Sequence, residues 1–147
     1  MGREVRTVGV DFSRGQLRGA VDIAPPAAVV QGDMAALPFS AGGFDAVTAY
    51  HSLIHILAAE QQAVIDEFAR VLRPGGRVLV TAGTVDWRGT NPDWLDTGVE
   101  MQWQIAGAGA TRGQLAAAGF TITDNWTGTV NLDGNEEWVF LAGRLDG

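Results

Sequence analysis

The stretch from Phe44 to Val80 constrains the fold more than any other part of the chain. An apolar run at 46–50 has the length of a buried strand, and 78–80 is a second such run. Between them an apolar stripe repeats with helical spacing. The Pro-Gly-Gly at 74–76 is expected to stop this helix, because proline cannot continue one and glycine adopts positive φ readily. Strand, helix and strand predict a right-handed βαβ unit on a parallel sheet. The stripe comprises Val64, Ile65, Phe68, Val71 and Leu72.

Three polar residues, His51, Ser52 and His55, come directly after the first of these strands. Ligands of open parallel sheets bind at the carboxyl ends of strands. Two histidines four residues apart would share one face of a helix, which also fits two ligands of a metal site. No third ligand is suggested by spacing, and H-E-x-x-H is absent. We therefore favour acid–base chemistry or substrate contact over metal binding. The plainer alternative is one core-facing and one solvent-facing histidine.

Two further strands are predicted upstream, at residues 7–10 and 28–30. A helix over 14–21 connects them, with Ser13 as its N-cap. The two prolines at 25–26 are expected to break that helix. Strands and helices therefore alternate through the first half of the chain, which predicts an α/β fold.

The pattern loosens beyond Val80. Residues 81–96 are expected to form a surface loop or partial lid, and 98–105 a strand or an extended arm. Thr111 is expected to cap a short helix that runs through Ala118, with Gly119 marking its end.

Two strands at 120–123 and 138–142, joined by a turn at 131–135, predict an antiparallel pair at the carboxyl end. All five tryptophans lie between Trp87 and Trp138. We expect this half of the chain to carry the lid and much of the aromatic packing.

Composition excludes several classes of protein. The 147 residues are 46% hydrophobic, which is enough for one domain over residues 1–147 with one core. There is no cysteine, so disulfides and thiolate metal sites are excluded. The net charge of −7, without a basic run, argues against a nucleic-acid partner. No apolar run approaches the ~20 residues of a membrane span, and no signal peptide is present, so we expect a cytoplasmic protein with no membrane partner.

Two aspartates follow the upstream strands. Asp11 is placed to accept hydrogen bonds from ribose hydroxyls, as in dinucleotide-binding sheets; the alternative is that it caps the next helix. Asp33 could accept from an exocyclic amine, with Met34 against an aromatic base. For that pair the residues alone favour a turn aspartate beside a core methionine.

Six segments, in this order and spacing, resemble the class I S-adenosylmethionine-dependent methyltransferases. The pattern is most similar to the small-molecule, ubiquinone-methyltransferase-like group and covers nearly the whole chain. The resemblance implies a Rossmann-like sheet, mostly parallel, with an antiparallel C-terminal hairpin. The segments are VGVDFS at 8–13, GDMAALPF at 32–39, FDAVTAYHSLIHI at 44–56, EFARVLRPGGRVLV at 67–80, QLAAAGF at 114–120 and EEWVFLAGR at 136–144.

The resemblance also implies which residues hold S-adenosylmethionine. Asp11 would bind the ribose hydroxyls and Phe12 would pack on the adenine. Asp33, after Gly32, would meet the adenine amine, and Met34 would lie beside the ring.

The acceptor side is implied in the same way. Tyr50 would line the methionine part of the cofactor, and His51 and His55 would face a small-molecule acceptor. For a hydroxyl or phenol acceptor one of the two histidines is the expected base. The sequence does not separate an oxygen from a nitrogen or carbon nucleophile.

One part of the family pattern is missing. Members of the family have a strand, a glycine loop and a helix before the VGVD strand, and this sequence has no G-x-G-x-G after an apolar strand. The missing strand would lie between those ending at Asp11 and Tyr50, so the expected domain is incomplete on its N-terminal side. The two strands could pair directly, a second copy or a partner chain could cover the exposed edges, or the chain could be a fragment of a longer protein.

Two functions follow as hypotheses. The first is methyl transfer to a small molecule. The second is a non-catalytic binding or interaction module that has lost the cofactor. A dinucleotide-dependent dehydrogenase is less favoured, because it also needs a glycine fingerprint.

Overall fold

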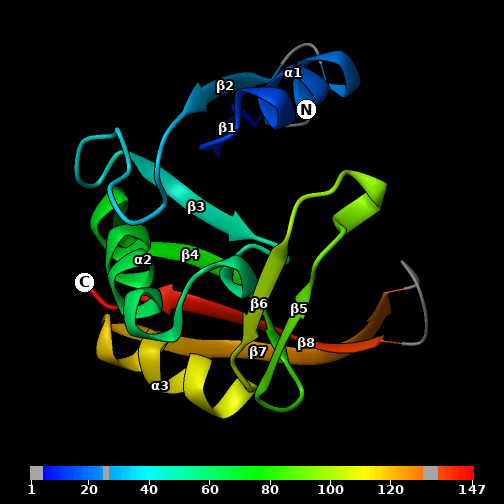
Figure 1. Cartoon of the computed structure of the whole chain (residues 1–147). Coiled ribbons are helices and arrows are strands. Elements are labelled where there is room, and N and C mark those ends of the chain that lie inside the picture. The colour runs from blue at the N-terminus through cyan, green and yellow to red at the C-terminus, as the bar shows by residue number, and fades with distance from the viewer. Residues whose placement is uncertain (1–4, 25–26, 131–135) are drawn as a thin grey trace. The chain divides into compact units, whose positions relative to one another are not determined.

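The computed structural model describes residues 5–24, 27–130 and 136–147, apart from the side chains of Leu95 and Val130. Strands and helices alternate along much of the chain, as predicted for an α/β protein (Figure 1). The chain divides into two compact units, residues 1–39 and 40–147. The single domain over the whole chain stays a prediction.

The first unit is a parallel two-stranded sheet with one helix. Strand β1 (Val8–Asp11) pairs with β2 (Ala28–Gln31), and α1 (Arg14–Ile23) connects them. The hydroxyl of Ser13 accepts a hydrogen bond from the backbone N–H of Gln16, 3.4 Å away, which confirms the predicted N-cap. The helix runs two residues beyond the predicted end, and the two prolines lie outside the described residues.

The second unit is built on a four-stranded sheet with the order β3–β4–β8–β7. The β3–β4 pair is parallel, whereas β4–β8 and β8–β7 are antiparallel. The parallel βαβ pair and the antiparallel C-terminal pair are therefore both confirmed. The predicted turn at 131–135 lies outside the described residues. The strands are β3 (Phe44–Ala49), β4 (Leu72–Gly83), β7 (Phe120–Val130) and β8 (Glu136–Leu145).

Helix α2 (Ala58–Val71) follows β3 after a short 3₁₀ turn, η1 (Leu53–His55). All five residues of the predicted apolar stripe are buried. The helix ends before the Pro-Gly-Gly at 74–76, which lies in the first part of β4. There the register shifts, because one residue of β3 stands opposite four of β4. The Pro-Gly-Gly also forms a bulge in the strand, and the end of the helix before it, with φ of 76° at Gly75, agrees with the predicted stop.

Helix α3 (Ala108–Ala117) begins earlier than predicted. Its N-cap is Gly107, and Thr111 is buried within the helix, so the predicted cap at Thr111 is wrong. Gly119 follows the helix with φ of 93°, a value that glycine adopts without strain, as predicted.

Residues 81–96 are more ordered than the predicted surface loop. They include β5 (Trp87–Asn91), which pairs antiparallel with β6 (Met101–Ile105), and a 3₁₀ turn, η2 (Trp94–Asp96), lies between the two strands. The ring of Trp103 lies 6.3 Å from that of Trp87 and 4.9 Å from that of Trp94. These ring contacts stabilise a hairpin that the sequence pattern does not reveal.

The core of the second unit lies between the sheet and helices α2 and α3, which pack side by side (Figure 1). Its fully buried apolar side chains come from both helices and from β4 and β8, and include Val64, Ile65, Val80, Leu115 and Leu141. No helix among the described residues has the length and apolar character that crossing a membrane requires.

Candidate functional site

In the first unit, the carboxyl ends of β1 and β2 lie next to each other. The backbone N–H of Gly32 donates a hydrogen bond to the carbonyl of Asp11 over 3.1 Å. A Cβ at Gly32 would lie 3.1 Å from Cδ of Pro38 and 3.3 Å from a methyl of Val10. The tight packing at Gly32 holds the loop that follows β2 against β1, and Asp33 is the next residue of that loop.

Asp11 and Asp33 each have a local structural role and a remaining acceptor. Oδ1 of Asp11 accepts from the N–H of Ser13 at 2.7 Å, and Oδ1 of Asp33 accepts from the N–H of Ala35 at 2.8 Å. The other oxygen of each carboxylate has no hydrogen-bond partner among the described residues. The capping and turn roles weighed from the sequence are both present, and each leaves one oxygen for a ligand.

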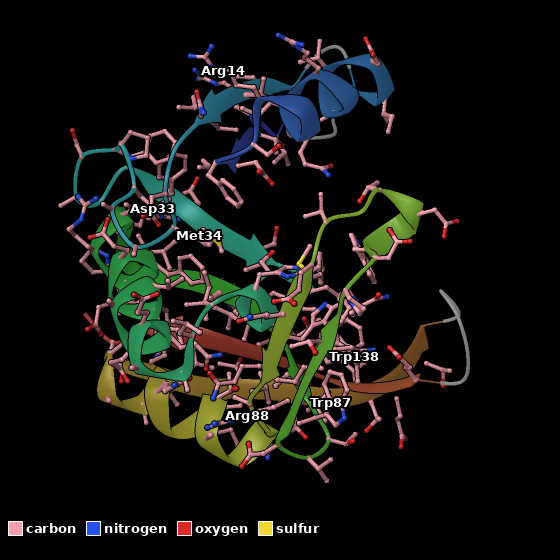
Figure 2. The ribbon with its side chains drawn as sticks, in the orientation of Figure 1. Arg14, Asp33, Met34, Trp87, Arg88 and Trp138 are labelled. Atoms are coloured by element: carbon pink, nitrogen blue, oxygen red, sulfur yellow. The ribbon has the colours of Figure 1, made fainter. Side chains whose placement is uncertain are left out.

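The same edge carries an apolar surface. The side chain of Phe12 is 78% exposed, and Met34 is half-buried in the turn after Asp33 (Figure 2). The amide of Gln31 fixes the neighbouring backbone: it donates to the carbonyl of Phe12 at 2.8 Å and accepts from Nε of Arg14 at 3.0 Å. Two carboxylate oxygens beside a phenyl ring and a thioether suit a ligand with hydroxyl or amine donors and a flat apolar ring.

In the second unit, His51 is held in an unusual conformation at the end of β3. Its φ is 49°, a left-handed value that costs a non-glycine residue of order 1 kcal/mol or more. Its N–H donates to the hydroxyl of Thr81 at 2.7 Å, and Thr81 is only 2% exposed. The imidazole meets the ring of Trp138 edge-to-face at 4.7 Å. Backbone and ring are thus both fixed.

Tyr50 belongs to a row of aromatic rings across the sheet. It is 51% exposed, and its ring meets that of Phe140 at 6.2 Å. Phe140 in turn stacks on Trp126 at 5.5 Å with an interplanar angle of 4°. The row crosses from the end of β3 to β8 and β7, and Trp126 is exposed.

His55 lies apart from His51. It ends η1, is exposed, and lines a cavity of about 370 Å³ between η1 and the β5–β6 hairpin. Ile56 and Trp103 supply apolar walls, and Arg88 supplies a cation. Because His51 precedes the 3₁₀ turn with positive φ, the two histidines do not share a helical face. The described residues contain no cluster of three side chains suited to a metal ion.

Three glutamines of the second unit were missed by reading the sequence. Gln61, Gln104 and Gln114 line a second cavity, of about 450 Å³, near the base of the hairpin. The sequence contains a signal for one of the three. Gln61 lies three residues before Val64 on the apolar stripe, and it is buried like its neighbours. A polar side chain on a buried stripe indicates a hydrogen-bond network.

Comparison with protein families and curated proteins gives partial matches. A family model described as a methyltransferase domain matches residues 1–80. The demethylmenaquinone methyltransferase of Mycobacterium tuberculosis (strain H37Rv) is 48% identical over 73 residues, which are 50% of this chain and 30% of that protein. The match therefore spans less than a third of that relative's length.

Solved structures resemble nearly the whole chain. An S-adenosylmethionine-dependent methyltransferase from Methanosarcina mazei aligns with a TM-score of 0.82 at 15% identity, covering 95% of this chain and 81% of the other. The 1,6-didemethyltoxoflavin-N1-methyltransferase of Burkholderia thailandensis, solved with 1,6-didemethyltoxoflavin and S-adenosylhomocysteine, aligns with a TM-score of 0.74 at 16% identity, covering 97% and 62%. These likenesses confirm the predicted Rossmann-like fold.

Proposed function

Because the chain belongs to the methyltransferase domain family, we propose that it binds S-adenosylmethionine and takes part in methyl transfer to a small-molecule acceptor. The observation that carries this proposal is the pair of carboxylates at adjacent parallel strand ends, each with one oxygen already engaged and one left over. The known relative and the solved methyltransferases support the same chemistry.

The residues of the first unit fit the adenosyl part of this cofactor. We assign the second carboxylate oxygen of Asp11 to the ribose hydroxyls, and that of Asp33, after Gly32, to the adenine amine. Phe12 and Met34 provide apolar surface for the purine ring. Each of these residues has an exposed or half-buried side chain at one edge of the unit.

The second unit supplies the residues that we assign to the acceptor. The bound cofactor provides an activated methyl group on a sulfonium, so the protein has to position the acceptor and remove its proton. We place the acceptor in the cavity beside His55 and assign that imidazole as the base, with His51 as the second candidate. Tyr50 is assigned to the methionine part of the cofactor.

An aromatic acceptor fits these surroundings best. The cavity wall contains Trp103, whose ring can stack on a planar molecule, and Ile56. The relative from M. tuberculosis is named for demethylmenaquinone, and the B. thailandensis enzyme was solved with a planar heterocycle. We therefore propose a planar aromatic small molecule as the methyl acceptor.

Calorimetric titration with S-adenosylhomocysteine tests the cofactor assignment. Wild type is expected to bind, and Asp11→Asn is expected to lose about tenfold in affinity, because one oxygen that accepts from ribose becomes a donor. The asparagine oxygen still accepts from Ser13, so the fold should persist. Asp22→Asn, an exposed aspartate on α1, is the matched control and should bind like wild type.

The titration also addresses the alternative function. A wild-type protein that gives no heat with the cofactor or its product at millimolar concentration would favour a non-catalytic binding module. Equal binding by wild type and Asp11→Asn would instead refute the assignment of Asp11 alone.

The partner proposal concerns the strand edges. Among the described residues, β1 pairs only with β2, and β3 pairs only with β4, so each has one edge without a partner strand. Such edges associate readily with another chain. We propose that a second copy or a partner chain covers them, and sedimentation over a range of concentrations is the measurement. A strict monomer would exclude the second copy. The cytoplasmic location stays a prediction.

A further inference from the structure

We propose that the second cavity, at the base of the β5–β6 hairpin, binds a small zwitterion of the α-amino acid class. Its volume of about 450 Å³ lies within the range of small-molecule sites in proteins. Residues of α2, α3 and both strands of the hairpin line it. This site lies outside the residues assigned above to cofactor and acceptor, except that Arg88 and Gln104 also line the first cavity.

Gln114, which lines the cavity, has a buried side-chain acceptor without a donor among the described residues. The amide nitrogen of Gln61 donates to two backbone carbonyls of the preceding turn, at 3.1 and 3.2 Å. The oxygen of Gln61 therefore faces Gln114, whose amide nitrogen donates to it at 3.4 Å. This leaves Oε1 of Gln114 buried, with no donor among the described residues. A buried acceptor without a partner costs about 1–3 kcal/mol, so a ligand that donates an N–H there gains a strong hydrogen bond.

The charged groups of the cavity are a complementary pair. The guanidinium of Arg88 forms no ion pair among the described residues. Oδ1 of Asp86 accepts from the N–H of Gly107 at 2.6 Å, and its second oxygen has no described partner. The oxygen of Gln104 is bound to the N–H of Ala58, so its amide NH₂ is left as a donor. One cation, one carboxylate oxygen, an amide donor and an amide acceptor match a ligand with a carboxylate and an ammonium group.

The remaining residues of the cavity wall favour a ligand with an apolar side chain. Trp87 and Ile105 line the same cavity, together with small alanines of both helices. Figure 2 shows Trp87 and Arg88 on neighbouring positions of β5. An indole ring beside small residues leaves space for an aromatic or branched aliphatic side chain. L-Phenylalanine is therefore a suitable probe.

Three probes separate the contributions of the two charged ends. The wild-type chain, without cofactor, is titrated with L-phenylalanine, with 3-phenylpropanoate, which lacks the ammonium group, and with 2-phenylethylamine, which lacks the carboxylate. Binding is followed by ¹⁵N NMR of the side-chain amides of Gln104 and Gln114. We expect L-phenylalanine to bind about tenfold or more tightly than either analogue, since each lacks one charge-assisted hydrogen bond.

Two variants and a control locate the site. Gln114→Leu removes the unpaired acceptor and should reduce affinity for L-phenylalanine about tenfold, with little effect on 3-phenylpropanoate. Arg88→Gln should weaken the binding of L-phenylalanine and of 3-phenylpropanoate, which both carry a carboxylate, and leave the binding of 2-phenylethylamine unchanged. Gln102→Leu, which lines only the first cavity, should bind like wild type. Equal affinity of wild type for all three probes, or no shift of either amide with any of them, would overturn the proposal.

Discussion

The side-chain oxygen of Gln104 lies 2.7 Å from the backbone nitrogen of Ala58 and accepts its hydrogen bond. Ala58 is the first residue of α2, and Leu57 before it has no side chain that can cap the helix. A residue of β6 therefore satisfies an N–H that local sequence leaves unpaired. A similar contact, from Asp86 to Gly107, joins the base of the hairpin to the start of α3. The β5–β6 hairpin is thus bonded to the N-termini of both helices.

Replacing Gln104 should destabilise the second unit. Gln104→Leu removes the acceptor for Ala58 and is expected to lower the free energy of unfolding by about 1 kcal/mol, as for loss of an N-cap. Gln104→Glu keeps an oxygen and adds a negative charge at a helix N-terminus, so stability should be retained. Urea denaturation measures both. Gln102→Leu on the same strand is the control, and an equal loss there would show that the contact with α2 is not the cause.

The bond between Thr81 and His51 leads to a second prediction. Thr81→Val is nearly isosteric but leaves the N–H of His51 without its acceptor, and we expect it to cost about 1–3 kcal/mol. Thr81→Ser keeps the hydroxyl and loses only a buried methyl, worth about 0.8 kcal/mol. In chemical denaturation the free energy of unfolding should therefore be highest for wild type, lower for Thr81→Ser and lowest for Thr81→Val. The reverse order of the two variants would mean that methyl packing, and not the hydrogen bond, holds His51 in place.

Two glycines should respond to alanine in opposite directions. Gly113 lies within α3, and a Cβ there would meet no other part of the protein within 4 Å, so Gly113→Ala should stabilise the protein by about 1 kcal/mol. At Gly83 a Cβ would overlap with Cγ2 of Ile105 and would come within 2.9 Å of the carbonyl oxygen of Val85. Gly83→Ala should therefore destabilise by about 1–3 kcal/mol. Thermal melts of the two variants test the contrast. An unchanged melting temperature for Gly83→Ala would show that β6 moves away from the added Cβ at little cost.

The elements that could be predicted from sequence are those whose signal is local. The apolar stripe of α2 identifies the helix because burial repeats every three to four residues. The start of α3 could not be placed in this way, since its N-cap is a glycine held by Asp86, 21 residues away. The β5–β6 hairpin depends on contacts among Trp87, Trp94 and Trp103, and the intervening loop has no two-residue hairpin signal such as Asn-Gly or Asp-Gly.

The same distinction between local and long-range signals applies to the residues of the candidate site. The positions of Asp11 and Asp33 at neighbouring strand ends could be predicted, because the carboxyl ends of parallel strands meet at one edge of the sheet. The glutamine network could not, because its hydrogen bonds join residues 46 and 53 positions apart. His51 shows a third case: its positive φ depends on Thr81, and no pattern around His51 reveals that bond.

Asp33 provides the sharpest test of the adenine assignment. In Asp33→Asn one amide oxygen can still accept from the N–H of Ala35, so the turn should persist and stability should change by less than about 0.5 kcal/mol. The NH₂ group would then face the adenine amine, donor against donor. We expect affinity for S-adenosylhomocysteine to fall about tenfold in calorimetry.

The matched ligand for this variant is S-inosylhomocysteine, whose purine carries an oxygen where adenosine has the amine. Wild type should disfavour it, because the Asp33 carboxylate would meet another acceptor. Asp33→Asn should bind it better than wild type does, since the NH₂ can donate to that oxygen. An exchange of preference between the two ligands would place Asp33 at the amine. A parallel loss for both ligands would mean that Asp33 acts only through the turn that it forms with Ala35.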